Sequence, residues 1–392
     1  MNVSTILKTH NDLNNDTFAK SPTNLICFSH LRWDFVYQRP QHLLSRFATR
    51  FTVFFVEEPV FDDHGDATLS LRPKSDDLWI VTPHLRGGIS HEEVIQTQKD
   101  LLDKFLKNKD LEDYIFWYYT PMALAFSGHL KAGLTLYDCM DELSMFKNPP
   151  AGLHEFEETL LKKADIVFTG GQNLYEYKKD KHHNIFPFPS SIDKKHFQQA
   201  RTISEEPEDQ RNIPGPKLGF YGVIDERFDI GLIEQIAVQK PDWNIILLGP
   251  VVKINPDDLP RHQNIHYLGG KSYNDLPQYL SGWDVALIPF LLNDSTRFIS
   301  PTKTPEYLAA GVPVVSTAIT DVVHPYGVEG IVKIASDAKG FVEAAEEHLK
   351  LDKTGWLPVV DKFLADKSWS ATFTNMLKKI NTTIINKKTI KS

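Results

Sequence analysis

The sequence predicts an α/β protein made of two domains, each organised around a mostly parallel β-sheet. The first observation is that short apolar runs alternate with amphipathic segments, and that this alternation occurs twice along the chain. The second is a stretch between the two halves, residues 198–216, that is charged and Pro-rich and has no hydrophobic periodicity. The third is the length of 392 residues, which is enough for two separate hydrophobic cores.

The first domain is predicted over residues 24–197. Residues 1–23 lack a long apolar core, so we expect a flexible leader rather than a signal peptide or a membrane anchor. Six apolar runs predict the buried strands of this domain: Leu25–Ser29, Thr52–Val56, Leu78–Val81, Tyr114–Tyr119, Leu134–Tyr137 and Ile166–Phe168.

The second domain is predicted over residues 217–366, after a linker at residues 198–216. A strand, a helix and a strand in close succession favour parallel pairing, because the crossover brings the second strand back in the same direction. The six strands predicted here are Leu218–Tyr221, Ile245–Leu248, Ile265–Leu268, Val285–Phe290, Val312–Thr317 and Ile331–Ile334.

The end of the chain, residues 367–392, is predicted to form a helix from Trp369 to Ile384 and a basic tail. Cations can approach the anionic face of a membrane, and each contributes roughly 1 kcal/mol near the surface. The alternative is a solvated, frayed terminus. The segment has no acidic residue, and its lysines are Lys367, Lys378, Lys379, Lys387, Lys388 and Lys391.

Composition and charge exclude other classes of protein. The formal net charge of -8 disfavours bulk binding to nucleic acid, so we expect no nucleic-acid partner. No run approaches the roughly 20 apolar residues of a transmembrane helix. Cys27 and Cys139 occur in apolar contexts, and neither has a second cysteine or a histidine at a ligand spacing. We therefore expect reduced, structural thiols and a cytoplasmic protein.

The segment from Ser300 to Thr317 predicts a ligand-facing loop, a short helix and a buried strand. Ser300 suits the N-cap, Pro301 the first helical position, and Gly311 the left-handed conformation that ends a helix. The predicted helix therefore begins at Ser300. Its first turn follows the carboxyl end of a strand, where parallel sheets bind ligands, and its free amides and Lys303 suit an anion such as a diphosphate.

The pattern P-x-K-x-x-E-Y-L-A-x-G-x-P-V-V in this segment resembles the donor-binding signature of retaining GT-B glycosyltransferases of family 4. The resemblance implies two Rossmann-like domains that face each other across a cleft, with the last helix crossing back to the first domain. It also implies that Glu306 accepts hydrogen bonds from the ribose hydroxyls of a nucleotide sugar. Many members carry a glutamate eight positions earlier, where this chain has Phe298.

On the same resemblance, the residues at the start of the helix bind the donor: Ser300, Thr302, Lys303, Thr304 and Glu306. The alternative for this helix is a surface position with an ion pair between Lys303 and Glu306, three residues apart.

The segment from Ser29 to Phe47 follows the first predicted strand and supplies charge and an aromatic platform. Its pattern W-D-F-V-x-Q-R-P-Q-H-L resembles a subgroup of bacterial transferases for cell-surface polysaccharides, among them teichuronic-acid-type enzymes. Helix capping is the alternative for Gln38 and Arg39, and a structural histidine is the favoured interpretation of His30 and His42. The acceptor-side candidates are His30, Arg32, Trp33, Asp34, Gln38 and Arg39.

Two further positions are candidates for catalysis. Asp141 follows a predicted strand and could orient a donor hydroxyl or accept a proton from the acceptor, although helix capping is an equal alternative. Arg227 follows the first strand of the second domain, where its guanidinium suits phosphate oxygens. A structural pair with Asp225 or Glu226 is the alternative. Gly222 allows close approach of the backbone to the donor. The catalytic candidates are thus Asp141, Arg227 and Lys303.

The resemblance implies transfer of a hexose-type sugar from a nucleotide sugar, a UDP-sugar in preference to a GDP-sugar, with retention. The acceptor is expected to be a hydroxyl of a cell-surface polysaccharide or glycolipid precursor. The alternatives are a nucleotide-sugar epimerase of the same fold and a non-catalytic nucleotide-sugar-binding scaffold. We expect a cytoplasmic enzyme, with peripheral contact at the inner face of the membrane through the basic tail, and no obligatory cofactor.

No obligatory metal is expected, because Asp138 and Asp141 lack the D-x-D spacing of metal-dependent transferases. Turnover of a nucleotide sugar should therefore be the same with and without EDTA. Loss of turnover that added manganese or magnesium restores would contradict this expectation.

Overall fold

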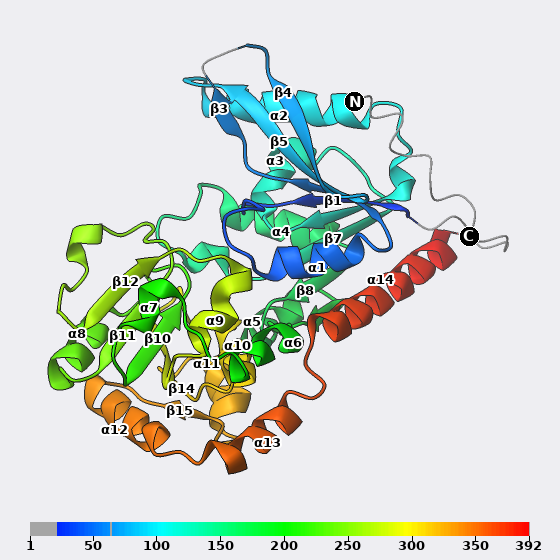
Figure 1. Cartoon of the computed structure of the whole chain (residues 1–392). Helices are drawn as coiled ribbons and strands as arrows, with labels where there is room; N and C mark the ends of the chain where they lie inside the picture. Colours follow the sequence, from blue (N-terminus) through cyan, green and yellow to red (C-terminus); the bar gives the residue numbers. More distant parts are fainter. Residues whose placement is uncertain (1–21, 63–64, 392) are drawn as a thin grey trace.

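The computed structural model describes residues 22–62 and 65–391 (Figure 1). It consists of two α/β domains, each with its own sheet, and the predicted fold class is confirmed. The expected leader, residues 1–23, falls almost entirely outside the described residues.

The sheet of the first domain has the order β3-β5-β2-β1-β6-β7-β8-β9, with β4 paired to β5. All of its pairs are parallel except β4 with β5. The strands are β1 (Asn24–Phe28), β2 (Thr52–Val56), β3 (Val60–Asp62), β4 (Thr68–Ser75), β5 (Leu78–Arg86), β6 (Tyr114–Tyr118), β7 (Leu134–Cys139), β8 (Ile166–Thr169) and β9 (Ile185–Pro187).

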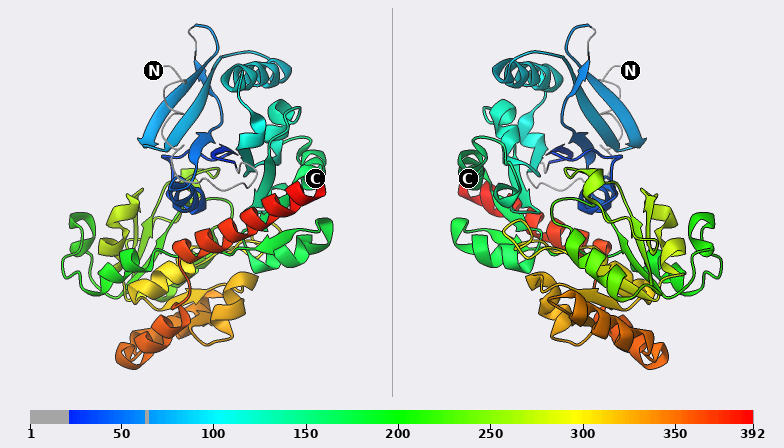
Figure 2. Two further views of the ribbon diagram at one scale, coloured as in Figure 1. Left: turned by 90° about the vertical axis from the view of Figure 1, so that its right-hand side faces the viewer. Right: turned by 90° about the vertical axis from the view of Figure 1, so that its left-hand side faces the viewer.

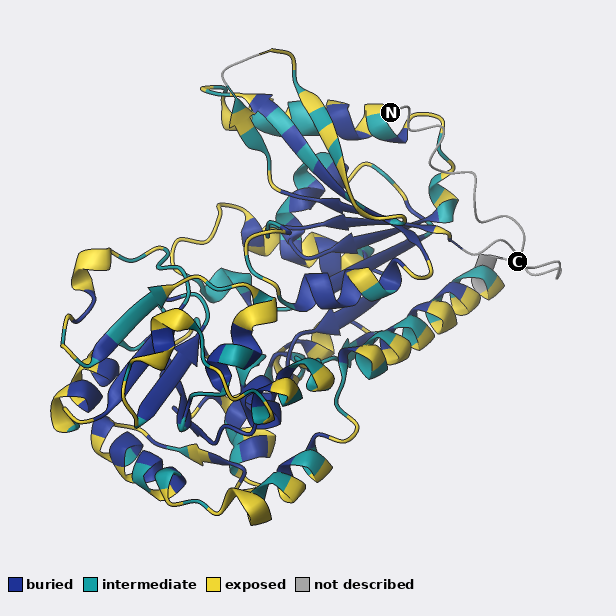
Figure 3. Ribbon diagram, in the orientation of Figure 1, coloured by how far each residue is buried: buried dark blue, intermediate teal, exposed yellow. Residues whose placement is uncertain are grey.

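The sheet of the second domain has the order β12-β11-β10-β13-β14-β15 and is parallel throughout. Its central strands are buried along their whole length, as expected of a sheet covered on both faces (Figure 3). The strands are β10 (Lys217–Tyr221), β11 (Asn244–Leu248), β12 (Ile265–Gly269), β13 (Val285–Ile288), β14 (Val314–Ser316) and β15 (Val332–Ile334).

Helices surround both sheets and join most successive strands, although none lies between β2 and β5 in the sequence. Those of the first domain are α1 (Arg39–Phe47), α2 (His91–Leu106), α3 (Leu124–Ser127), α4 (Leu153–Lys163) and α5 (Gln172–Lys178). Those that follow are α6 (Lys194–Gln198), α7 (Glu208–Arg211), α8 (Ile230–Gln239), α9 (Leu276–Leu280), α10 (Lys303–Ala310), α11 (Thr320–Val322), α12 (Ala338–Leu349), α13 (Lys353–Phe363) and α14 (Trp369–Lys391).

The strands that the sequence does not predict lie at the edge of the first sheet. β4 alternates only between exposed and half-buried residues, so it carries no buried apolar face that a sequence pattern could indicate. β3 and β9 are three residues long, too short for any periodicity to be seen. All the predicted strands form. Most of them contain a run of consecutive buried residues, whereas in β12 only Ile265 is buried.

Residues 198–216, predicted as a linker, pack closely against the second domain. Gln210 is fully buried, and its side chain bonds the Tyr279 carbonyl at 2.9 Å and the Trp283 indole at 3.0 Å. Arg201 forms a two-pronged ion pair with Asp361 at 2.8 Å. Polar contacts of this kind have no hydrophobic period, which is why the sequence pattern misses them. The division of the chain into domains and linker remains our interpretation.

The last helix, α14, crosses back and packs on the first domain, as the fold class predicts (Figure 2). Trp369 at its start is fully buried and stacks on His42 of α1, with the ring centroids 4.8 Å apart. Met376 and Ile380 continue the same buried face. The helix therefore joins the second domain to the core of the first.

Part of the basic tail contacts the protein surface. Lys387 pairs with Asp165 at 2.6 Å, and the Lys379 ammonium lies 3.9 Å from the centroid of the Phe186 ring. Within the described residues, no helix combines the length and the apolar character needed to cross a bilayer.

Trp369→Ala should lower the free energy of unfolding by about 3–5 kcal/mol, because it empties a buried site between α14 and the first sheet. The matched control is Ile385→Ala, on the same helix but exposed, which should change stability by less than about 0.5 kcal/mol. Denaturant titrations of both variants provide the measurement. Equal effects would show that Trp369 does not anchor the helix.

Candidate functional site

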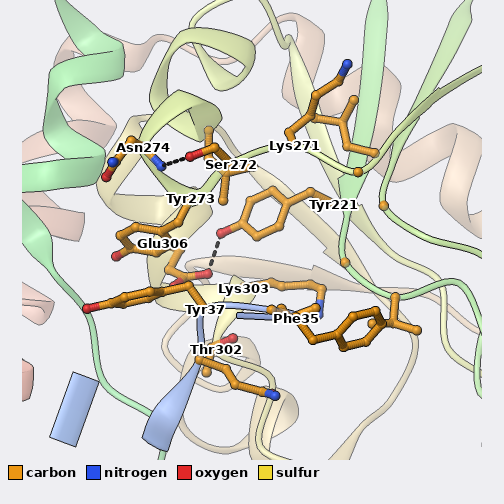
Figure 4. Close-up of a pocket in the computed structure, with 18 of the residues that line it drawn as sticks. Phe35, Tyr37, Tyr221, Lys271, Ser272, Tyr273, Asn274, Thr302, Lys303 and Glu306 are labelled. Atoms are coloured by element: carbon orange, nitrogen blue, oxygen red, sulfur yellow. Dashed lines mark hydrogen bonds between the residues drawn. The ribbon is translucent and has the colours of Figure 1, made fainter. Parts of the chain in front are cut away.

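A cleft between the two domains contains a cavity of about 890 Å³. Its walls come from the loop after β1 in the first domain and, in the second, from the ends of β10, β11 and β12 and from the start of α10 (Figure 4). These segments follow the carboxyl ends of parallel strands, which is where open α/β sheets bind ligands.

The helix α10 begins later than the sequence predicts. The predicted start is Ser300, whereas the helix runs from Lys303 to Ala310. The Ser300 carbonyl accepts a hydrogen bond from Ser190 Oγ of the first domain at 2.8 Å, so this residue serves an interdomain contact outside the helix. The predicted helix end is confirmed, because Gly311 has a left-handed φ of 81°.

Glu306 is buried at the floor of the cleft, and the Tyr221 hydroxyl donates a hydrogen bond to its Oε2 atom. Burial raises the pKa of the Glu306 carboxyl to about 8, although this hydrogen bond and the charge of Lys303 oppose the rise. Ionised Glu306 therefore needs further hydrogen-bond donors, which the hydroxyls of a ligand would supply.

Lys303 enters the cleft one turn before Glu306. Its Nζ atom lies 5.5 Å from the centroid of the Phe220 ring and 5.7 Å from that of the Phe290 ring. Burial, and next the positive charge of Arg227, lower the pKa of Lys303 to about 8. No ion pair joins Lys303 to Glu306 in the part of the chain that the structure describes. An anion in the cleft would raise this pKa again.

Gly222 gives Lys303 its path into the cleft. Its φ is 137°, a conformation that favours glycine, and a Cβ atom there would lie 2.3 Å from Lys303 Cε. Of the other predicted donor-side residues, Thr302 also lines the cavity, whereas Ser300 and Thr304 do not. Thr304 is fully buried, and its hydroxyl is without a hydrogen-bond partner among the described residues.

A second cavity, of about 700 Å³, lies mainly in the first domain and has largely apolar walls. Asp141, His30 and Arg227 contribute to its lining, together with Lys253. Gln38 lines both cavities, so the two are neighbours at this residue.

Asp141 lies half-buried at the second cavity. Burial raises its pKa to about 6, while the positive charges of Arg227 and Arg39 oppose the rise. Glu142, not Asp141, occupies the N-cap position of the short helical turn that follows, and it makes no side-chain capping hydrogen bond. Glu142 itself is committed to an ion pair with Lys178 at 2.6 Å.

Arg227 forms an ion pair with Asp225, which is the structural alternative that the sequence offers for this residue. The guanidinium bonds both carboxylate oxygens, the shortest contact being Nη2 to Oδ2 at 2.6 Å, and it lies 5.4 Å from the centroid of the Phe146 ring. Arg227 lines the second cavity rather than the cavity of Lys303. Its charge nevertheless reaches Lys303, because it contributes to the lowered pKa of that ammonium.

The predicted acceptor-side residues separate into two groups. Trp33, Asp34 and Gln38 line the first cavity, and His30 lines the second. Burial and the charge of Lys253 lower the pKa of His30 to about 4, so this imidazole is neutral at physiological pH.

The other group is engaged within the protein. Arg32 bonds the Pro59 carbonyl at 3.1 Å and contacts Glu57. Arg39 is buried and pairs with buried Asp138 at 2.8 Å, and it reaches neither cavity. The structure thus corrects the expectation of an acceptor-side Arg39. A buried guanidinium is retained only when a carboxylate compensates it, and a sequence cannot place that partner 99 residues away.

Two tyrosines that the sequence does not predict as site residues line the cleft. Tyr37 of the first domain stacks on Tyr273 of the second, with the ring centroids 4.6 Å apart. Tyr273 also stacks on His196 at 4.4 Å. The only available signal was the position of Tyr37 within the segment that includes Trp33, since Tyr273 lies in a polar stretch without a motif.

Comparison with known sequences finds a similarity in the second domain. Residues 216–350 match the sequence model of a family described as Glycosyl transferases group 1. A protein of Bacillus subtilis (strain 168), named for teichuronic acid biosynthesis as the glycosyltransferase TuaH, is 25% identical over 225 residues, which is 51% of this chain. The chain spans about half the length of that relative, 54%.

Comparison with solved structures defines the fold. Sucrose-phosphate synthase from Thermosynechococcus elongatus superimposes with a TM-score of 0.66 at 14% identity, over 92% of this chain and 98% of that one. An α,α-trehalose 6-phosphate synthase from Burkholderia multivorans gives 0.64 at 13% identity, over 95% and 99% of the two chains. The fold is that of GT-B glycosyltransferases.

Gly222→Ala should weaken the binding of a nucleoside diphosphate about tenfold, because the added methyl group collides with Lys303 and strains the backbone by roughly 1–3 kcal/mol. The matched control is Gly330→Ala, where φ is 69° and a Cβ atom has nothing within 4 Å. Calorimetry on both variants measures the effect. If a folded Gly222→Ala variant binds the nucleoside diphosphate with unchanged affinity, the collision with Lys303 has no effect on binding.

Proposed function

We propose that the protein transfers a hexose-type sugar from a nucleotide sugar to an acceptor hydroxyl, with retention of configuration. The observation that carries this proposal is the adjacency of two cavities at Gln38. The first holds Lys303 and Glu306, and the second holds Asp141 and Arg227. Two neighbouring cavities suit two substrates, which favours transfer over the epimerase and scaffold alternatives.

The donor nucleotide is assigned to the first cavity. Glu306 would accept hydrogen bonds from the ribose hydroxyls, replacing the hydration that burial denies its carboxylate. Lys303 would contact the diphosphate, with Thr302 beside it and Gly222 leaving the backbone accessible. A structural neighbour from E. coli is described as bound with UDP-2-fluoro glucose, which supports a nucleotide-diphosphate sugar, and we favour UDP.

Catalysis would rest on stabilising the departing diphosphate. Negative charge grows on this group as the sugar bond breaks, so a cation that already stands in a low-dielectric cleft stabilises the transition state more than the ground state. Lys303 is the principal candidate. Arg227, held by Asp225, would add positive potential from the side of the sugar. Asp141 would orient a hydroxyl or accept the proton of the acceptor.

The acceptor is assigned to the second cavity. Its apolar walls and the polar groups among its lining residues suit a molecule that carries both kinds of surface, such as a glycan or a glycolipid precursor. The name of the B. subtilis relative supports a cell-surface polysaccharide. His30 and Gln38 would face the acceptor, whereas Trp33 and Asp34 line the first cavity, on the side of the donor. Such a substrate is consistent with a cytoplasmic protein whose basic tail meets the inner face of the membrane.

The test begins with a thermal-shift screen of nucleotide sugars, since a ligand at about 100 times its dissociation constant adds roughly 2.7 kcal/mol of stability. With the donor known, Lys303→Ala should lower kcat by about 10² and raise the donor KM less. The matched control is Lys339→Ala, an exposed lysine of α12. A wild-type kcat in the Lys303 variant would remove this residue from the site.

The pH dependence of donor affinity gives a second measurement. The pKa of Lys303 is lowered to about 8, so its charge is present below this pH and lost above it. The contribution of Lys303 to donor affinity should therefore fall as the pH rises from 7 to 9, while ionisation of Glu306, whose pKa is raised to about 8, acts in the opposite direction. Lys303→Arg keeps its charge over this range and should remove that part of the slope. Any dependence of donor affinity on pH that remains in Lys303→Arg is assigned to Glu306. A pH dependence equal to that of the wild type would contradict the assignment to Lys303.

A further inference from the structure

Four residues of the second domain, which precede and follow α10 in the sequence, contact the first domain. They are Arg297, Phe298 and Ser300 in the loop before the helix, and Asp321 in α11 after it. We call this set the interdomain strut. Its contacts with α5 lie apart from the covalent connections between the domains, whereas Ser300 meets the chain at Ser190, beside the connection that leads into the second domain.

Phe298 supplies the apolar part of the strut. Only 4% of its surface is exposed, and it belongs to a buried cluster whose other buried members all lie between residues 26 and 185. Its ring centroid lies 4.6 Å from that of Tyr177 in α5. A residue of the second domain therefore completes a core of the first. A glutamate at this position would bury a carboxylate among apolar side chains.

Asp321 supplies the polar part. Its carboxylate accepts hydrogen bonds from the backbone amides of Gln172 at 2.9 Å and Asn173 at 3.0 Å, which are the first residues of α5. Amides in the first turn of a helix have no partner within the helix, so a carboxylate there acts as a cap. In this protein the cap for a first-domain helix comes from the second domain.

Two further hydrogen bonds join the loop to the first domain. Asn173 Nδ2 donates to the Arg297 carbonyl at 2.5 Å, and Ser190 Oγ donates to the Ser300 carbonyl at 2.8 Å. The second bond is made three residues before Lys303. The position of this ammonium relative to the first domain therefore depends directly on the strut.

We propose that the interdomain strut sets the spacing of the two domains, and that Phe298 is a positioning residue for the cleft. With the strut in place, α10 faces the loop after β1 across the cavity, and the two neighbouring cavities meet at Gln38. Without it, the domains keep their folds but lose their fixed spacing. The structural part of this proposal stands on the contacts alone, while its catalytic consequence rests on the proposed function.

Distance measurements between spin labels test the structural part. Labels are attached at Lys104→Cys in α2 and Lys339→Cys in α12, which are exposed, and both native cysteines are buried. The wild-type strut should give one narrow distance distribution. Phe298→Ala should broaden or shift it, and Phe298→Leu should largely restore it. The matched control is Phe341→Ala, which removes an equally buried ring from the second domain core and should leave the distribution narrow.

Asp321→Ala provides an independent variant, because it removes the cap without altering the apolar core of the first domain. It should broaden the same distribution even where Phe298→Ala fails to fold. A narrow, unshifted distribution in Asp321→Ala, or in a folded Phe298→Ala, would overturn the proposal. Broadening to the same extent in Phe341→Ala would also overturn it, since the effect would then follow from lost stability.

Kinetics test the catalytic consequence. Phe298→Ala should lower kcat by about tenfold or more, while the donor dissociation constant changes by less than about threefold, because Lys303 and Glu306 remain in their own domain. Phe298→Leu should recover most of the turnover. Equal losses in kcat and in donor affinity would contradict positioning. If the wild-type protein binds no nucleotide sugar, the proposed function fails, and the distance measurement still decides on the strut.

Discussion

The site depends on one constraint, which is that the second half of the chain buries apolar and polar groups in the first domain at separate places. Trp369 docks at the start of α14, Phe298 completes a first-domain core, and Asp321 caps α5. Neither domain alone contains the cleft, because its walls come from both. Buried rings pack closely, and the amides at the start of a helix need hydrogen-bond partners at short range. Both kinds of contact are lost on small displacements, so together they hold the cleft geometry.

Within that geometry the main physical cost is the burial of two opposite charges one turn apart. Burial raises the pKa of Glu306 and lowers that of Lys303, so each group is held away from its preferred ionised state. A nucleotide would relieve both costs at once, through hydroxyl donors for the carboxylate and phosphate oxygens for the ammonium. Perturbed groups that converge on a cleft are the usual mark of a functional site.

Two other buried cations, Arg39 and Lys178, are compensated by carboxylates and have a structural role. Arg39 and Asp138 form a closed pair beneath the first-domain loop, and Lys178 is held by Glu142 and Glu157. The difference lies in the partners rather than in the residue types. Arg39 has a carboxylate and a carbonyl as acceptors, whereas Lys303 faces aromatic rings and open cleft.

The sequence by itself determined the two α/β domains, their buried strands, the return of the last helix and the segment that carries Lys303 and Glu306. These features are encoded locally, in apolar runs, in a helix-ending Gly311 and in one compact motif. Only the tertiary structure decided that Arg39 is enclosed, that Arg227 stands at the second cavity, and that Phe298 packs into the other domain. Each of these outcomes depends on a partner distant in the chain, and no local pattern specifies where such a partner will lie.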